Sequence, residues 1–416
     1  MANRAHIIVN PENEWRTKSP GPLDWERDTR PGAAKKYLMI STDTHMSPPP
    51  KIFGERIAEE FKPRLPRIEV KDGKKYIIIE GAKPSRIMEP QMEGEDLLRQ
   101  KSGGAPITME FEDHEKEKKG LERIADQALD GVDGEVIYPN GPALLLWAVD
   151  DARFATAQAE IWNDWAMEVC KPFHDKCKPV AAIVPADIET AVKEVERVAK
   201  LGYSSVVMPL KPYPGPHRQD RPNYNHPDFD PLWAALQDHD LPINYHVATG
   251  MDPRTASGLG GAVINYVVHA NAPTMEPIVG MCASGVFERF PKLKAVTVEA
   301  NAGWVPWMLD QMDEAYLKHH FWIYPKLKTK PSDYYRSNCY STVAEDPAGL
   351  ILCEPYGLGD NLMWANDYPH HEGTWPHSAE AIERTFQNHV SEENRKKILG
   401  LNAARLYGFD IPQDYA

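Results

Sequence analysis

Short apolar runs begin at residue 37 and recur along the rest of the chain. Most are almost continuously apolar, a pattern typical of parallel strands that are buried on both faces. They lie at residues 37–42, 134–139, 179–185, 203–209, 242–247, 294–300, 338–343 and 361–367. Segments with a helical period separate them. The clearest is 186–202, where Asp187 is placed to cap the start of a helix and Gly202 to end it.

This alternation of strands and helices predicts an α/β fold, and the number of strands favours a (β/α)8 barrel. A doubly wound open sheet is the competing architecture, because the number of strands depends on how the apolar runs are divided. One interval is unusually long, since about ninety residues separate the first strand from the second. Within it, Asp72-Gly73 stands between two alternating runs, which is a hairpin signal.

We therefore expect two parts of the chain. Residues 1–36 are polar and rich in proline and charge, and they predict an extended arm that wraps its own domain or a partner subunit, with simple disorder as an equal alternative. Residues 37–416 form the barrel domain, with an insertion at about 49–130 after the first strand. We interpret this insertion as a small β flap with helices, lying over one end of the barrel.

Composition narrows the class of protein. The chain of 416 residues is 42% hydrophobic and carries a formal charge of −14, which argues against nucleic acid and anionic membranes as partners. The five cysteines are odd in number and scattered, which fits a reduced, cytoplasmic protein. We see no signal peptide at the N-terminus, and the longest apolar runs are too short to cross a bilayer.

Candidate chemistry follows from asking what stands at the carboxyl end of each predicted strand, where barrel enzymes place their working residues. Asp43 and His45 end the first strand, and because they are two residues apart they point to the same face. His246 ends the fifth strand, Glu299 the sixth, and Asp367 the eighth, with His370 shortly after it. Singly each has an ordinary structural explanation. Together they predict a metal site, since mixed histidine and carboxylate sets suit zinc, manganese or iron.

The chain also resembles a known family. The segments "ISTDTHMSPP", "VEANAGWVPWMLDQMD" and "ANDYPHHEGTWP", together with His246, are similar to the amidohydrolase-related group often called amidohydrolase 2, from about residue 37 to 408. The resemblance implies a distorted TIM barrel with a metal held by Asp43, His45, His246 and Asp367. It also implies hydrolysis or non-oxidative decarboxylation. A histidine commonly follows strand six in the decarboxylases, and this chain differs there in having Glu299.

The leading interpretation is a mononuclear zinc or manganese enzyme that hydrolyses or decarboxylates a small carboxylated or aromatic compound. Asp367 is then ligand and general base, His370 or His371 its proton partner, and Glu299 a candidate acid or base. The alternative is a dinuclear Mn/Fe monooxygenase in which Glu299 is a shared ligand. A third interpretation is a non-catalytic partner subunit. We expect a homo-oligomer, or a hetero-oligomer with a related chain.

Overall fold

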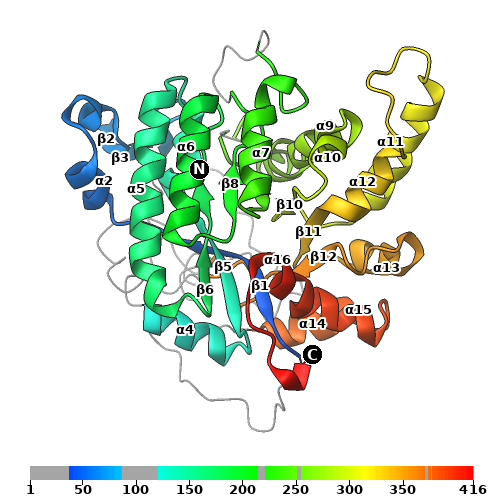
Figure 1. The fold of residues 1–416 in the computed structure, drawn as a ribbon. Coiled ribbons are helices and arrows are strands. Elements are labelled where there is room, and N and C mark those ends of the chain that lie inside the picture. The colour runs from blue at the N-terminus through cyan, green and yellow to red at the C-terminus, as the bar shows by residue number, and fades with distance from the viewer. Residues whose placement is uncertain are drawn as a thin grey trace.

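The computed structural model describes residues 37–86, 120–213, 221–250, 254–370, 373–375 and 377–415. Parallel strands stand at the centre of the molecule and helices lie outside them (Figure 1). The strands follow one another around the sheet in chain order, with bounds β1 Ile40–Met46, β5 Gly134–Pro139, β6 Cys177–Pro179, β7 Ala181–Ala182, β8 Val206–Met208, β9 Ile243–His246, β10 Ala295–Val298, β11 Cys339–Val343 and β12 Leu362–Trp364.

The predicted third strand, 179–185, is two short strands on either side of Val180. Its first half pairs with β5, and Val180 itself donates its N–H to the Ile137 carbonyl at 3.0 Å. Its second half pairs with β8, starting where Ala181 donates to the Ser205 carbonyl at 3.1 Å. This stretch of chain therefore pairs first with β5 and then with β8, and β6 and β7 together form one strand of the barrel.

The first and last strands meet, which distinguishes a closed barrel from an open sheet. His45 donates its N–H to the Tyr368 carbonyl at 2.7 Å, and Asp367 donates to the Asp43 carbonyl at 3.0 Å. Thr44 and Tyr368 form a parallel bridge at the same place. Counting β6 and β7 as one, eight strands close the ring, so the distorted TIM barrel is confirmed and the doubly wound alternative is wrong.

Helices connect the strands and cover the outside of the barrel. Helix α6 is the one with the clearest sequence signal, and both of its predicted ends are confirmed. Asp187 accepts a hydrogen bond from the Thr190 N–H at 3.1 Å, and Gly202 ends the helix at φ 98°. The α-helices are α2 Pro50–Arg56, α4 Gly120–Leu129, α5 Ala152–Cys170, α6 Ile188–Leu201, α7 Asp230–Asp238, α8 Gly261–Ile264, α9 Met275–Ala283, α10 Val286–Arg289, α11 Val305–Lys318, α12 Pro331–Asn338, α13 Pro347–Tyr356, α14 Ser378–Phe386, α15 Glu392–Lys396 and α16 Asn402–Tyr407.

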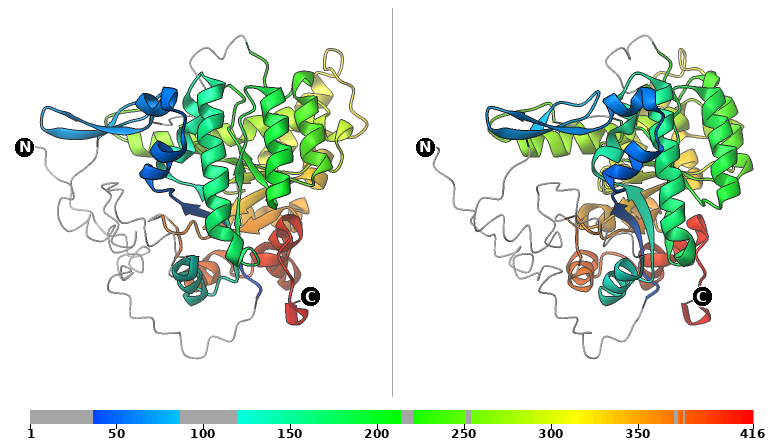
Figure 2. Two further views of the ribbon diagram at one scale, coloured as in Figure 1. Left: turned by 60° about the vertical axis from the view of Figure 1, so that its left-hand side comes forward. Right: turned by 90° about the vertical axis from the view of Figure 1, so that its left-hand side faces the viewer.

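The insertion after β1 contains an antiparallel sheet of β2 Arg67–Lys71, β3 Lys74–Ile78 and β4 Ser85–Arg86. The predicted hairpin is confirmed, because Asp72 at φ 50° and Gly73 at φ 71° form its turn. This hairpin projects clear of the barrel (Figure 2). The predicted arm at 1–36 and residues 87–119 of the predicted insertion lie outside the described residues, so those domain bounds stay predictions.

The interior is densely apolar, and its largest fully buried side chains include Trp147, Trp162, Trp233 and Trp364. All five cysteines are buried and free. Within the described ranges, no helix has both the length and the apolar character needed to cross a membrane.

Candidate metal centre

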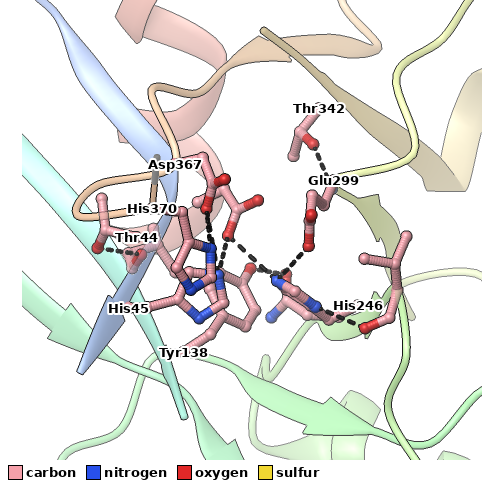
Figure 3. Close-up of polar contacts among 12 residues, drawn as sticks. Thr44, His45, Tyr138, His246, Glu299, Thr342, Asp367 and His370 are labelled. Carbon is pink, nitrogen blue, oxygen red and sulfur yellow. Dashed lines mark hydrogen bonds and ion pairs between the residues drawn. The ribbon is translucent and has the colours of Figure 1, made fainter. Parts of the chain in front are cut away.

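The predicted ligands converge at the carboxyl ends of the strands (Figure 3). Asp43 and His45 lie in β1, and His246 is the last residue of β9. Glu299 follows β10 directly, and Asp367 comes three residues after β12. These side chains are buried except for Glu299, of which 14% is exposed. The structure therefore brings together all five residues that the sequence singled out as metal ligands.

Main-chain carbonyls fix how the two buried imidazoles are protonated. Nδ1 of His45 lies 3.2 Å from the Pro139 carbonyl oxygen, and Nδ1 of His246 lies 2.8 Å from that of Val247. A carbonyl oxygen only accepts, so each Nδ1 must carry the proton and donate it. Each Nε2 is then left with a lone pair, and both lone pairs point into the same small space.

The other groups around this space are acceptors too. Nε2 of His246 lies 3.2 Å from Asp43 Oδ1 and 3.5 Å from Glu299 Oε2. Nε2 of His45 lies 3.4 Å from an oxygen of Asp43 and 3.4 Å from one of Asp367. Among the described residues, no hydrogen-bond donor reaches His45 Nε2 or Asp367 Oδ1, although both atoms are buried.

A cation resolves this arrangement. Lone pairs and carboxylate oxygens that face one another at 3.2–3.5 Å repel unless a positive charge lies between them. A set of imidazole nitrogens and carboxylate oxygens is the donor set of zinc, manganese and iron sites. The residues present therefore fit a divalent metal ion.

His370 extends the cluster toward solvent. Its Nδ1 lies 2.9 Å from Asp367 Oδ1, its Nε2 lies 3.1 Å from Asn140 Oδ1, and its ring stacks on that of His45 at 4.1 Å between centroids. Asn140 Oδ1 also accepts the Gly141 N–H at 2.7 Å, which identifies it as the oxygen of the amide. His370 Nε2 consequently donates to it. The side chain of His370 is 24% exposed, so it connects the buried carboxylate with the surface.

The possible ligands fall into two overlapping groups. Asp43, His45, His246 and Glu299 form one, in which the ligand atoms all lie within 4.8 Å of one another. His45, Asp367 and His370 form the other. The four ligands implied by the family resemblance are thus divided between the two groups, with His45 in both. The predicted His371 lies outside the described residues.

Electrostatics follow from this crowding. With no cation in the centre, protonated His246 and His45 would take its place beside Asp43: burial raises the pKa of this carboxyl, but their charges and hydrogen bonds outweigh burial and lower the pKa. For Glu299, burial and the nearby charge of Asp367 raise the pKa well above its ordinary value. Burial and His370 act to lower the pKa of His45, and its contacts with Asp367 and Asp43 reverse that effect and raise it.

Two of the acidic residues have an uncommon backbone conformation. Glu299 has φ 64° and Asp367 has φ 53°, in the left-handed region that few residues other than glycine adopt. Hydrogen bonds hold both in place, because Glu299 N–H donates to Thr342 Oγ1 at 3.0 Å and Asp367 N–H donates to the Asp43 carbonyl. Strained backbone of this kind gathers at functional sites, where the surroundings fix it.

The sequence interpretation missed two supporting residues. Asn140 immediately follows β5, so the strand-end rule that found the other residues could have found it. Arg123, in α4, is buried and donates to the His45 carbonyl at 2.6 Å and to Glu135 Oε1 at 2.5 Å. Its guanidinium also lies over the Tyr368 ring at 4.9 Å. No local sequence pattern predicts the role of Arg123, because all of its partners come from other parts of the fold.

Comparison with known proteins assigns the family. A family model described as Amidohydrolase matches residues 42–409, most of the chain. The chain belongs to the amidohydrolase family. A curated relative of this amidohydrolase is a gamma-resorcylate decarboxylase from Polaromonas sp., 25% identical over 288 residues that cover 67% of this chain and 83% of the relative.

Solved structures agree with the barrel. An amidohydrolase from Mycobacterium avium subsp. paratuberculosis matches with a TM-score of 0.72 and 22% identity, over 91% of this chain and 100% of that one. A dihydroxybenzoic acid decarboxylase from Polaromonas sp., with bound manganese and 2-nitroresorcinol, matches with a TM-score of 0.58 and 18% identity, over 91% and 99%. At such identities the likeness supports the fold of this amidohydrolase.

Proposed function

We propose that this amidohydrolase is a manganese-dependent carboxy-lyase that removes a carboxylate from a small aromatic acid without oxidation. The observation that carries the proposal is the set of imidazole lone pairs and carboxylate oxygens that face one another around one buried space. The decarboxylases among its relatives point to the reaction, and the manganese bound by one of them points to the metal. They give no support to the dinuclear monooxygenase alternative.

The reaction balances without an oxidant. The bond between ring carbon and carboxyl carbon breaks, carbon dioxide leaves, and the electron pair that remains on the ring carbon takes one proton. When bound, the metal would supply positive charge that holds the substrate and stabilises the negative charge of the transition state. Asp43, His45 and His246 would hold it, and the fold already fixes the orientation of the two histidine side chains.

The remaining residues handle the proton. His370 contacts Asp367 and is partly exposed, so this pair can pass a proton between solvent and the reacting carbon. Glu299 faces the same space from β10 and is the second carboxyl group that could deliver it. In this proposal Asp367 is both ligand and proton acceptor, and Glu299 takes the place of the histidine that commonly follows strand six in the decarboxylases.

The test measures metal content and carbon dioxide release on the same protein preparation. Protein purified without chelators is analysed by mass spectrometry for metals, then assayed with hydroxylated benzoates for carbon dioxide and, in parallel, for oxygen uptake. We expect about one manganese per chain and release of carbon dioxide without oxygen. His246→Ala should lose both metal and activity. His239→Ala is the matched control, since this exposed histidine ends α7, away from the centre.

Three results would contradict the proposal. Oxygen uptake with two metals per chain would favour the monooxygenase. Hydrolysis of amides or esters without release of carbon dioxide would favour a hydrolase. A folded protein that binds no metal would remove the basis of the proposal altogether.

A further inference from the structure

A buried asparagine joins several parts of the fold close to the metal centre. Asn244 lies in β9 two residues before His246, so the two side chains leave the strand on the same face. Its Nδ2 donates to the Val206 carbonyl on β8 at 2.9 Å, which identifies Oδ1 as the amide oxygen. Tyr138 and Tyr407 both donate their hydroxyls to that oxygen, at 2.9 Å and 2.7 Å.

This polar arrangement is complete and fully enclosed. Asn244, Tyr138 and Tyr407 are all buried, and two hydroxyls use both lone pairs of one amide oxygen. Branched aliphatic side chains fill the interior of most TIM barrels, and they would fill this space without burying polar groups. The strands β5 and β9 are not neighbours in the sheet, so the Tyr138–Asn244 hydrogen bond connects them across the interior.

The ring of Tyr138 packs beside both imidazoles of the centre (Figure 3). Its centroid lies 5.0 Å from that of His246 and 6.2 Å from that of His45, and the two imidazoles meet edge to face at 4.9 Å. Rings packed this closely cannot turn independently of one another. The position of the Tyr138 ring therefore restricts the orientation of both histidines.

The main chain beside Tyr138 acts on His45 as well. Tyr138 lies opposite His45 where β5 pairs with β1. The next residue, Pro139, supplies the carbonyl oxygen that accepts from His45 Nδ1 at 3.2 Å. A shift of Tyr138 would therefore displace both the ring and the carbonyl that hold His45. Its hydroxyl is bonded to the strand that carries His246, so one residue contacts the supports of both imidazoles.

We propose that Tyr138 is a positioning residue of the metal centre, and that its hydrogen bond to Asn244 fixes the spacing of the His45 and His246 Nε2 atoms. Ligands that are already held at the required spacing bind a metal ion more tightly than ligands that must first be ordered. The Tyr138 hydroxyl is engaged by Asn244, so this residue acts through the histidines and not on the metal. The inference rests on the metal of the proposed function, and it does not depend on the reaction.

The experiment measures metal affinity and stability on the same variants. The full chain is freed of metal with a chelator and titrated with manganese by isothermal calorimetry, and its melting temperature is recorded without metal. Tyr138→Phe keeps the ring and removes the hydrogen bond to Asn244. We expect the dissociation constant for manganese to rise by about 10-fold.

Tyr407→Phe is the matched control. It removes a hydroxyl from the same Asn244 oxygen, but Tyr407 lies on α16, and no ring contact joins it to either imidazole in the described part of the chain. We expect both phenylalanine variants to melt at similarly lower temperatures, and Tyr407→Phe to bind manganese as the wild type does. A purely structural role would change metal affinity equally in the two variants.

A further variant covers the case in which Tyr138→Phe does not fold. Asn244→Leu removes the acceptor of the same hydrogen bond, so it should also raise the dissociation constant by about 10-fold. The double variant Tyr138→Phe with Asn244→Leu should bind no more weakly than either single variant, because both changes remove one interaction.

Two results would overturn the inference alone. One is wild-type affinity for manganese in Tyr138→Phe or Asn244→Leu, and the other is an equal loss of affinity in Tyr407→Phe. A wild-type protein that binds no manganese would overturn the proposed function as well. Because the titration does not measure the reaction, manganese binding without release of carbon dioxide would contradict the proposed function only.

Discussion

The position of Glu299 in the metal centre depends on Thr342, a residue that is not itself one of the candidate ligands. Its backbone lies in the left-handed region, and its N–H donates to the buried hydroxyl of Thr342 on β11. That hydrogen bond satisfies a main-chain donor and fixes the backbone from which the Glu299 carboxylate extends. The Thr342 hydroxyl therefore helps to position Glu299 in the candidate metal centre.

Thr342→Val keeps the shape of the side chain and removes the oxygen acceptor. We expect a loss of about 1–3 kcal/mol in the free energy of unfolding, because the Glu299 N–H is left unpaired, and a metal affinity lower by about 10-fold. Thr342→Ser retains the hydroxyl and is the matched control. Chemical denaturation and metal titration would check both values. Equal behaviour of the valine and serine variants would show that this hydrogen bond does not hold Glu299 in place.

Asp151 offers a pH-dependent test away from the centre. It caps α5 by accepting the Arg153 N–H at 3.0 Å, and it pairs with Arg64 at 2.7 Å. The hydrogen bond from Arg64 comes first among the causes that lower the pKa of Asp151, and the N–H groups of Phe154 and Arg153 act in the same direction. A carboxylate whose pKa is lowered on folding stabilises the fold above its unfolded pKa of about 3.9, and that stability is lost as the pH falls from there through the lower pKa of the folded state.

Asp151→Asn removes the charge and keeps a side chain that can cap. We expect the variant to be less stable than the wild type at about pH 7, and the difference to shrink only as the pH falls below about 4, toward the lowered pKa of Asp151 in the folded state. Asp187→Ala on α6 removes a cap that has no arginine partner among the described residues, and it should cost about 1 kcal/mol from capping alone. Thermal unfolding of the wild type and both variants at several pH values measures these differences. A stability difference between the wild type and Asp151→Asn that grew in acid would refute the prediction.

The strand-end residues were predictable because their signal is local. An acidic or imidazole side chain directly after an apolar run needs no knowledge of the rest of the fold, which is how Asp43, His246 and Asp367 were found. Their contacts were not predictable in the same way. The stacking of His370 on His45, for example, depends on how the loop after β12 returns across β1.

At the scale of elements, α4 clamps the strands that carry the centre. Arg123 on this helix joins β1 through the His45 carbonyl and β5 through Glu135, while Gln127 donates to the same Glu135 carboxylate at 2.9 Å. Arg123 and Glu135 are both buried, so their charges depend on each other.

Arg123→Met leaves Glu135 as an uncompensated buried charge. We expect a loss of about 3–5 kcal/mol in the free energy of unfolding, since breaking a buried pair costs more than replacing it. Arg123→Met combined with Glu135→Leu replaces the whole pair and should recover much of that loss. Urea denaturation of the single and double variants would decide. A double variant as unstable as the single one would mean that the buried charge is not the cause.

The elements themselves could be predicted where one signal dominated. Continuous apolar runs located the barrel strands, and turn residues located the hairpin at Asp72-Gly73. The division of the third strand at Val180 was not visible, because it arises from a change of pairing partner between β5 and β8. A sequence pattern records the burial of a residue, and it does not record which neighbour the residue bonds.

At the scale of the whole molecule, the metal should contribute to stability. A ligand that binds only the folded chain stabilises it by about 2.7 kcal/mol when its concentration is 100 times its dissociation constant. We expect a chelator to lower the melting temperature of the wild type and added manganese to restore it. His246→Ala should respond to neither. An unchanged melting temperature in wild type would show that folding does not depend on the occupied centre.

The seam between β1 and β12 has a consequence for synthesis. Asp43 is made near the beginning of the chain and Asp367 near its end, and they lie side by side only after the last strand has closed the ring. A nascent or truncated polypeptide that ends before β12 contains Asp43 and lacks Asp367, so its set of candidate metal ligands is incomplete. In the proposed centre, an ion whose binding requires Asp367 would be held only once the final strand is in place, so we expect truncated products to stay empty and to remain open to proteolysis.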